Sequence, residues 1–187
     1  MTTTAPAIAI SGLAAPPVAR PAPLSSALLA DIATGLAASD DLWRPHAHHD
    51  PAARRPVRLV VCDLWEAWVV GWTPGQHVEA HDHGDSAGVL VVVEGDLVEV
   101  LPAGPHRVLR TWQAGEVVDL PVGVVHDVVG LGPGTSTSIH VYSPPLSTMT
   151  YYDDDGQPVR MEDTDDAPAI TDLRSVSRAL HPSQRRG

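Results

Sequence analysis

Histidines at strand spacing are the residues of this chain that point most directly to chemistry. His81 and His83 flank Asp82 in the segment from Gly75 to Gly95. If this segment is a β-strand, residues two apart share a face. His81 and His83 then direct two imidazoles to one point, and Asp82 faces the other way. Two converging neutral imidazoles are half of a metal site.

A second polar row occurs farther along the chain, in the run from Ser138 to Tyr142. On a strand, Ser138, His140 and Tyr142 share one face because they are spaced by two. They can form a hydrogen-bond relay from hydroxyl to imidazole to phenol. A histidine in a strand can also be a satisfied core residue, but the two hydroxyl groups on its face favour the relay.

Other histidines carry weaker signals. His46, His48 and His49 lie in a stretch, residues 39–56, that is rich in Pro and Asp and is predicted to be a loop or short helical turns. No strand fixes them, so we interpret them as a surface cluster. His77 shares the face of His81 if that strand is regular, and we interpret it as structural.

The elements that must position these side chains are short valine-rich segments between turn residues, a pattern typical of a β-sandwich or barrel. The predicted strands are Arg58–Cys62, Ala67–Trp72, His77–His81, Gly88–Val93, Leu97–Leu101, Arg107–Trp112, Glu116–Asp119, His126–Val129, Ser136–Tyr142, Met149–Tyr152 and Val159–Met161. Leu24 to Leu36 shows helical spacing, which predicts a helix over 26–38 capped by Ser25 or Ser26. A short final helix is predicted over 170–180.

The chain is expected to form one domain over 24–180, between a disordered Ala/Pro-rich tail at 1–23 and a frayed tail at 181–187. The formal net charge of −11 argues against a nucleic-acid partner. Part of that charge lies in acidic runs, including residues 162–166, that we interpret as solvated loops. The single Cys62 excludes an internal disulfide. We expect a cytoplasmic monomer with no membrane segment and a small-molecule substrate.

Two spacings resemble the two sequence motifs of the cupin superfamily: G-x5-H-x-H from Gly75, and G-x5-P-x-G-x2-H from Gly115 to His126. This resemblance implies an all-β fold, a small jelly-roll-like barrel with N-terminal helices outside, and His126 as the third metal ligand. The usual glutamate ligand of the first motif is replaced by Gly88. A centre of three neutral histidines favours a substrate that brings an anion, such as a thiolate, and a metal softer than magnesium, such as iron(II).

Longer runs narrow the resemblance. SIHVYSPP, HDHGDSAG and the Trp72–Gly75 run are similar to the cysteine dioxygenase family of thiol dioxygenases, over roughly residues 43–152. The resemblance implies iron(II) on His81, His83 and His126. It also implies that L-cysteine and O2 react to give cysteine sulfinic acid, in cysteine catabolism. Tyr142 is then expected to donate a hydrogen bond to the substrate carboxylate or the bound oxygen, oriented by His140 and Ser138.

The same resemblance implies an arginine that holds the substrate carboxylate, and Arg58 is its best match. Arg54, Arg55 and Arg160 are competing candidates. Animal members of the family carry a cysteine, crosslinked to the tyrosine, where this chain has Gly88, so Tyr142 is expected to be an unmodified phenol. Two alternatives stay open: a dioxygenase of 3-mercaptopropionate or another thiol acid, and a non-catalytic cupin that binds a metal or small ligand.

Overall fold

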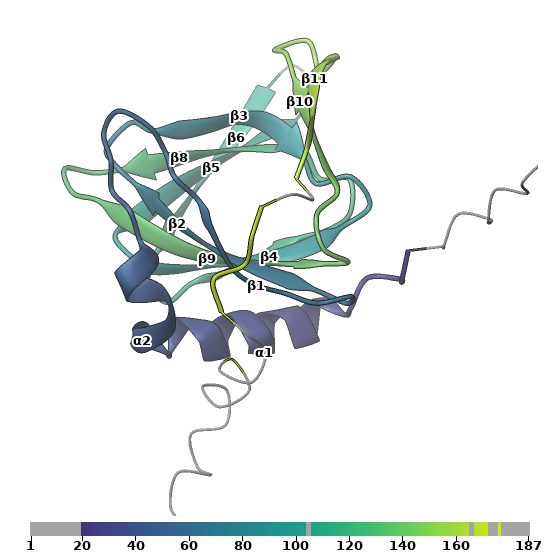
Figure 1. Ribbon diagram of the computed structural model, residues 1–187. Helices are drawn as coiled ribbons and strands as arrows, with labels where there is room; N and C mark the ends of the chain where they lie inside the picture. Colours follow the sequence, from purple (N-terminus) through teal and green to yellow (C-terminus); the bar gives the residue numbers. More distant parts are fainter. Residues whose placement is uncertain (1–19, 104–105, 165–166, 172–175, 177–187) are drawn as a thin grey trace, which may run out of the picture.

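The computed structural model describes residues 20–103, 106–164, 167–171 and 176 (Figure 1). Two short helices and a 3-10 turn precede a long series of strands. The helical elements are α1 (Ser26–Ala37), α2 (Asp40–Trp43) and η1 (Arg44–His46). The strands are β1 (Val57–Val61), β2 (Glu66–Trp72), β3 (His77–Asp82), β4 (Ala87–Glu94), β5 (Asp96–Ala103), β6 (His106–Gln113), β7 (Val117–Leu120), β8 (His126–Leu131), β9 (Ser136–Ser143), β10 (Thr148–Tyr152) and β11 (Pro158–Asp163). Each predicted strand is present, within two residues at either end.

The strands form two antiparallel sheets that face each other. One has the order β1-β2-β9-β4-β7 and the other the order β11-β10-β3-β8-β5-β6. This confirms the predicted all-β, jelly-roll-like cupin architecture with helices outside. No ladder joins the two sheets in the described part of the chain, so they form a sandwich with edge strands rather than a closed barrel.

Strands β4 and β9 are buried on both faces because α1 covers one face of their sheet and the second sheet covers the other (Figure 1). Val89 and Val91 of β4 belong to the same core cluster as Leu29 and Leu36 of α1. The alternate residues of β4, Leu90 and Val92, belong to a second cluster between the sheets. Burial on both faces explains why β4 is apolar throughout instead of alternating.

Helix α1 begins as its sequence predicts, since the Ser25 hydroxyl accepts a hydrogen bond from the Leu28 amide at 3.3 Å. It ends at Ala37, one residue before the expected end. In the loop that follows, the His49 ring lies within hydrogen-bond distance of the Ser136 carbonyl and the Thr137 hydroxyl. His49 therefore attaches this loop to β9. No metal-binding cluster includes His46, His48 or His49 among the described residues.

Residues 167–171 run beside β1. The Ile170 amide donates to the Arg58 carbonyl at 3.1 Å, and the Thr171 amide donates to the Leu59 carbonyl at 2.9 Å. The predicted final helix and the tail 181–187 lie outside the described residues, apart from 170, 171 and 176. The same holds for the tail 1–23 apart from 20–23, where Arg20 pairs with Asp85 at 2.6 Å. No helix in the described part has the length and apolar character needed to cross a membrane.

Candidate metal centre and active-site pocket

Three buried histidines converge between the sheets. His81 ends β3 with Asp82, His83 follows it directly, and His126 opens β8 as the ladder partner of His81. Their ligand atoms all lie within 4.8 Å of one another, and each side chain is at most 4 % exposed. The structure thus brings together the three histidines predicted as ligands.

An irregularity in β3 determines which residues face this cluster. The register between β3 and β8 shifts between Val78 and His81. Val78 packs in the core between the sheets, whereas His77 is exposed. His77 and His81 would share a face on a regular strand, but the shift separates them. Asp82 points away from the cluster, and its carboxylate accepts hydrogen bonds from the Tyr152 hydroxyl at 2.5 Å and the Gly84 amide at 2.9 Å.

Hydrogen bonds determine which ring nitrogen of two histidines carries the proton. His81 Nδ1 lies 2.7 Å from the main-chain oxygen of Glu79, which can only accept, so Nδ1 donates and Nε2 keeps its lone pair. His126 Nδ1 likewise donates to the Glu99 carboxylate at 2.9 Å. The Nε2 atoms of His83 and His126 are buried and have no hydrogen-bond partner in the described part. A metal ion is the partner that such converging lone pairs fit.

Burial also favours the neutral form of two of the three histidines. It lowers the pKa of His81 to about 3, and the neighbouring His126 lowers it further. Burial likewise holds the pKa of His83 well below its ordinary value. A neutral imidazole can ligate a metal, whereas an imidazolium cannot. The donor set is therefore suited to a divalent cation that accepts nitrogen ligands.

Glu99 supports the cluster and was not predicted from the sequence. It lies on β5, is 3 % exposed, and holds both His126 and the indole N–H of Trp112, the latter at 3.2 Å. A carboxylate behind a ligating histidine fixes the orientation of the ring and raises its basicity. The signal in the sequence was the alternation on this strand, which puts Glu99 on the same buried face as Leu97.

The predicted polar row on β9 forms a continuous chain of hydrogen bonds. The Trp72 indole N–H donates to the Ser138 hydroxyl at 2.9 Å, and Ser138 lies 2.8 Å from His140 Nε2. His140 Nδ1 lies 2.9 Å from the Tyr142 hydroxyl. If Ser138 donates to Nε2, then Nδ1 carries the proton and donates to the Tyr142 oxygen, which leaves the phenolic proton for another acceptor. Burial lowers the pKa of His140 to about 3 and raises that of Tyr142.

The absence of a side chain at Gly88 leaves room for the Tyr142 ring. The two residues are ladder partners on β4 and β9, and a Cβ atom on Gly88 would lie 2.7 Å from Cδ1 of Tyr142. Any side chain at this position would displace the ring, so the glycine that replaces the usual cupin glutamate also sets the place of the phenol.

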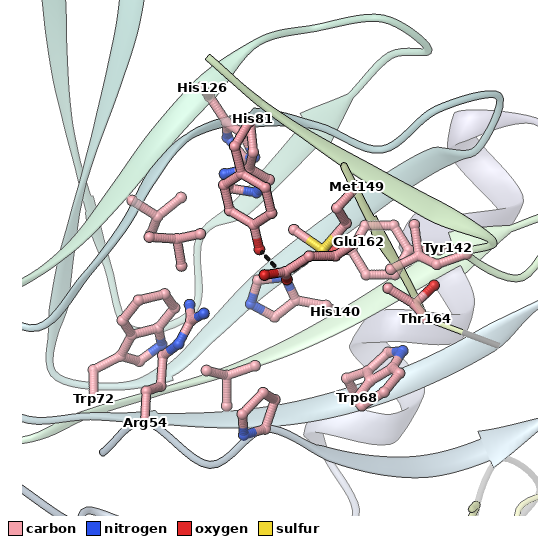
Figure 2. A pocket seen from close by; sticks show the side chains of 16 residues that line it. Arg54, Trp68, Trp72, His81, His126, His140, Tyr142, Met149, Glu162 and Thr164 are labelled. Carbon is pink, nitrogen blue, oxygen red and sulfur yellow. Dashed lines mark hydrogen bonds between the residues drawn. The ribbon is translucent and has the colours of Figure 1, made fainter. Parts of the chain in front are cut away.

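A pocket of about 220 Å³ lies between the sheets beside these groups (Figure 2). His81 and His126 form one wall, and His140 and Tyr142 lie across from them. Aromatic and aliphatic side chains supply most of the remaining surface. The further lining residues are Arg54, Pro56, Trp68, Val70, Trp72, Val78, Val128, Leu146, Met149, Tyr151, Glu162 and Thr164. A mostly apolar pocket with a few convergent polar groups is typical of a small-molecule site.

Arg58 is not among the residues that line this pocket. Its guanidinium pairs with the buried carboxylate of Glu66 at 2.8 Å and donates to the carbonyls of Ala167 and Thr164, at 2.6 and 3.1 Å. The predicted carboxylate-binding residue is thus held by other protein groups beside the pocket and does not line it. The physical reason is that Arg58 compensates the charge of Glu66, which is fully buried.

Of the competing arginines, Arg54 lines the pocket. No ion pair or hydrogen bond of its guanidinium is found in the described part, and the guanidinium lies 5.1 Å from the centre of the Trp72 ring. Burial lowers its pKa from the ordinary value. Arg55 instead pairs with Asp50, and Arg160 pairs with Glu79 and Glu162. A half-buried cation without a protein carboxylate is a ready site for an anionic ligand group.

Several solved structures resemble this fold. A conserved protein with a double-stranded β-helix domain from Klebsiella pneumoniae is 18 % identical, with a TM-score of 0.49 over 54 % of this chain and 85 % of that chain. A cupin superfamily protein from Desulfitobacterium hafniense is 11 % identical, with a TM-score of 0.47 over 55 % and 87 %. A cupin 2 conserved barrel domain protein from Salinispora arenicola is 24 % identical, with a TM-score of 0.43 over 54 % and 83 %.

The sequence comparison is more specific than the structural one. The profile of the family described as cysteine dioxygenase type I matches residues 20–155, a range that contains the three converging histidines, the Ser138–His140–Tyr142 row and Arg54. The function class that accompanies this match and this fold is that of a thiol dioxygenase. The chain belongs to the cysteine dioxygenase type I family.

Proposed function

We propose that this protein is an iron-dependent dioxygenase that converts L-cysteine to cysteine sulfinic acid. The thiol loses its proton, both atoms of O2 form bonds to sulfur, and the net change is RSH + O2 → RSO2⁻ + H⁺. Sulfur is oxidised by four electrons and O2 is reduced by four, so no further reductant is needed. The observation that carries the proposal is a small pocket that adjoins the three-histidine cluster and is also lined by Arg54, an arginine with no ion pair among the described residues.

His81, His83 and His126 are the residues that would hold the metal. Fe(II) would supply a redox-active centre at which a thiolate and O2 can react. The protein supplies neutral ligands, so a thiolate substrate brings the negative charge that the cluster lacks. Glu99 keeps His126 in the tautomer and orientation that ligation needs.

Arg54 is the residue that we propose for the substrate carboxylate, in place of Arg58. A guanidinium binds a carboxylate through two parallel hydrogen bonds, and such charge-assisted pairs are stronger in a site that excludes water. Arg54 lines the pocket beside Trp72, whereas the guanidinium of Arg58 is engaged with Glu66. The same arginine can hold 3-mercaptopropionate, so Arg54 alone does not select between the two thiol acids.

Tyr142 is proposed to act as a hydrogen-bond donor to the substrate. Burial, followed by the nearby charge of Glu66, raises its pKa, so it stays a protonated phenol at neutral pH. With the His140 proton on Nδ1, this N–H donates to the phenol oxygen, and the phenolic proton is free to point into the pocket. This arrangement suits a group that must orient the substrate carboxylate or oxygen without becoming charged.

The test is sulfinate formation by the protein loaded with Fe(II). L-cysteine should consume one O2 for each sulfinate formed, and 3-mercaptopropionate should react more slowly. Tyr142→Phe should retain iron and lose most of the turnover, whereas His126→Ala should lose the iron. Faster turnover of 3-mercaptopropionate would favour the thiol-acid alternative. Absence of O2 uptake with every thiol would favour a non-catalytic cupin. We also propose that the enzyme serves cysteine catabolism as a cytoplasmic monomer.

A further inference from the structure

We propose that Tyr152 is a positioning residue for the metal ligand His83 and acts on it through Asp82. The Tyr152 hydroxyl would then contribute to how tightly the three-histidine centre holds its metal, although it lies on the side of β3 that faces away from the cluster. The inference rests on one part of the proposed function, the use of the three histidines as metal ligands. The sequence pattern predicted no role for either Tyr152 or Asp82.

The three histidines differ in what orients their rings. His81 Nδ1 donates to the main-chain oxygen of Glu79 at 2.7 Å, and His126 Nδ1 donates to the Glu99 carboxylate at 2.9 Å. No hydrogen bond of the His83 ring is found among the described residues, although the side chain is only 2 % exposed. The direction of the His83 ring therefore depends on its packing and on the main chain that carries it.

The main chain at His83 is held by a side chain rather than by a strand ladder. His83 follows the end of β3 and precedes the turn that leads to β4. Asp82 Oδ1 accepts a hydrogen bond from the Gly84 amide at 2.9 Å, so the carboxylate closes a turn around His83. The His83 carbonyl accepts from the Ser86 amide at 3.1 Å. Asp82 thus fixes the residues on both sides of the ligand.

Tyr152 holds the other oxygen of this carboxylate. Its hydroxyl donates to Asp82 Oδ2 at 2.5 Å, a distance typical of a hydrogen bond to a charged acceptor. In the ladder between β10 and β3, Thr150 pairs with Asp82 and Tyr151 pairs with His81. Because this ladder is short, the Tyr152 hydroxyl adds substantially to the contacts that fix the end of β3.

Loss of the hydroxyl should therefore loosen one of the three ligands. Without Tyr152, the Asp82 carboxylate has a free oxygen and can rotate, and water then competes for the Gly84 amide. The turn around His83 becomes less well fixed, and its Nε2 converges less often with those of the other two histidines. Removal of groups that orient metal ligands typically costs 10- to 100-fold in affinity. Since Tyr152 acts through Asp82 on one ligand, we expect a loss of about tenfold.

The experiment measures metal affinity without turnover. Cobalt(II) is the probe, and its dissociation constant is measured by competition with a chromophoric chelator. The variants are Tyr152→Phe, Asp82→Ala, Asp82→Asn and the double variant with Tyr152→Phe and Asp82→Ala. Tyr151→Phe is the matched control because it removes the same hydroxyl from the neighbouring residue, whose hydrogen bond is donated to Glu162. Thermal unfolding of the metal-free proteins checks that each variant is folded.

Tyr152→Phe should weaken cobalt binding by about tenfold, and Tyr151→Phe should bind cobalt within about twofold of the wild type. Asp82→Ala should lose at least as much affinity as Tyr152→Phe. Asp82→Asn should lose less, since its amide oxygen can still accept from Gly84. The double variant should bind like Asp82→Ala alone, because the hydroxyl then has no carboxylate to hold.

Hydrogen exchange in the metal-free protein gives a second readout that needs no metal. The Gly84 amide should exchange faster in Tyr152→Phe than in the wild type, because its acceptor is less well fixed. The amides of β4 should keep their wild-type exchange rates. A general loss of stability would instead speed exchange in both places.

Equal cobalt affinities of Tyr152→Phe and the wild type, or additive losses in the double variant, would overturn the inference. So would a loss in Tyr151→Phe that equals the loss in Tyr152→Phe, since it would assign the effect to the β10–β11 hairpin as a whole. Failure of the proposed function has a different signature: the wild type binds metal but forms no sulfinate from any thiol. The cobalt affinities and the Gly84 exchange rates still report the role of Tyr152 in that case.

Discussion

Replacement of Arg58 by methionine tests whether this arginine supports the fold or binds the substrate. The Arg58–Glu66 pair is buried, with the two side chains 5 % and 0 % exposed and 2.8 Å apart. Removal of one partner leaves a buried carboxylate without its counter-ion, which costs about 3–5 kcal/mol in comparable pairs. At about 2–4 °C per kcal/mol for a domain of this size, Tm should fall by about 6–20 °C.

The loss should also depend on pH in a defined direction. Burial raises the pKa of Glu66, and Arg58 opposes this shift. Without Arg58 the pKa of Glu66 in the folded state rises further above its value in the unfolded chain. A group with a raised folded pKa contributes stability at pH values below its unfolded pKa, and this contribution is lost as pH rises through the folded pKa. Arg58→Met should therefore be more destabilised at pH 8 than at pH 5.

Calorimetric unfolding at both pH values measures this, and kcat/KM for L-cysteine is measured below the transition. Arg58→Met should have kcat/KM within a few-fold of the wild type, and adding Glu66→Gln should recover part of the lost Tm because no buried charge then remains. Arg54→Gln should show the reverse pattern, with a normal Tm and a large loss of kcat/KM. A wild-type Tm for Arg58→Met, combined with a tenfold rise in KM, would refute the reasoning.

Three further changes probe the groups around the pocket. Glu99→Gln should weaken metal binding by about 10- to 100-fold because the support of His126 becomes uncharged, as competition with a chromophoric chelator would measure; unchanged affinity contradicts the role. Gly88→Ala should cost about 1–3 kcal/mol in thermal unfolding and reduce turnover with iron retained, since the new methyl displaces the Tyr142 ring; a variant as stable and active as the wild type contradicts this. In the metal-free protein, the lowered pKa of His140 should reduce the free energy of unfolding by about 1.4 kcal/mol per pH unit as pH falls from 6.5 towards 3. The free energy of unfolding, measured in urea at several pH values, should therefore fall less steeply in His140→Asn than in the wild type. An equal pH dependence in the two proteins would exclude this contribution.

Much of the fold could be predicted because the sequence has a clear periodicity. Turn residues separate the strands, and period-two spacing put Ser138, His140 and Tyr142 on one face, as the structure has them. The convergence of the histidines could be predicted for a similar reason. His81 and His83 lie two residues apart, and the motif around His126 adds a third histidine, which lies on β8 opposite His81 of β3.

The choice between Arg54 and Arg58 could not be made from spacing. Arg58 lies on a strand whose inward residues are buried, and its partner Glu66 opens the next strand of the hairpin. Arg58 is the ladder partner of Trp68, which lies two residues from Glu66, and the register then shifts between Arg58 and Val60, which no local pattern indicates. Arg54 reaches the pocket from irregular chain before β1, and such chain has no period from which to infer a direction.

Glu99 and Glu162 show why acidic residues on strands need the tertiary register for their interpretation. Glu99 shares a buried face with Leu97, and a carboxylate is stable there only because His126 and Trp112 donate to it. Glu162 belongs to an edge strand on which every residue is exposed, so alternation carries no information about its direction. Its place in the pocket follows from the β10–β11 pairing, in which Arg160 lies opposite Tyr151 and so brings the Glu162 carboxylate within reach of the Tyr151 hydroxyl. A change in that register by one residue would direct Glu162 to the other face and remove the anionic group from the pocket, while leaving the three histidines in place.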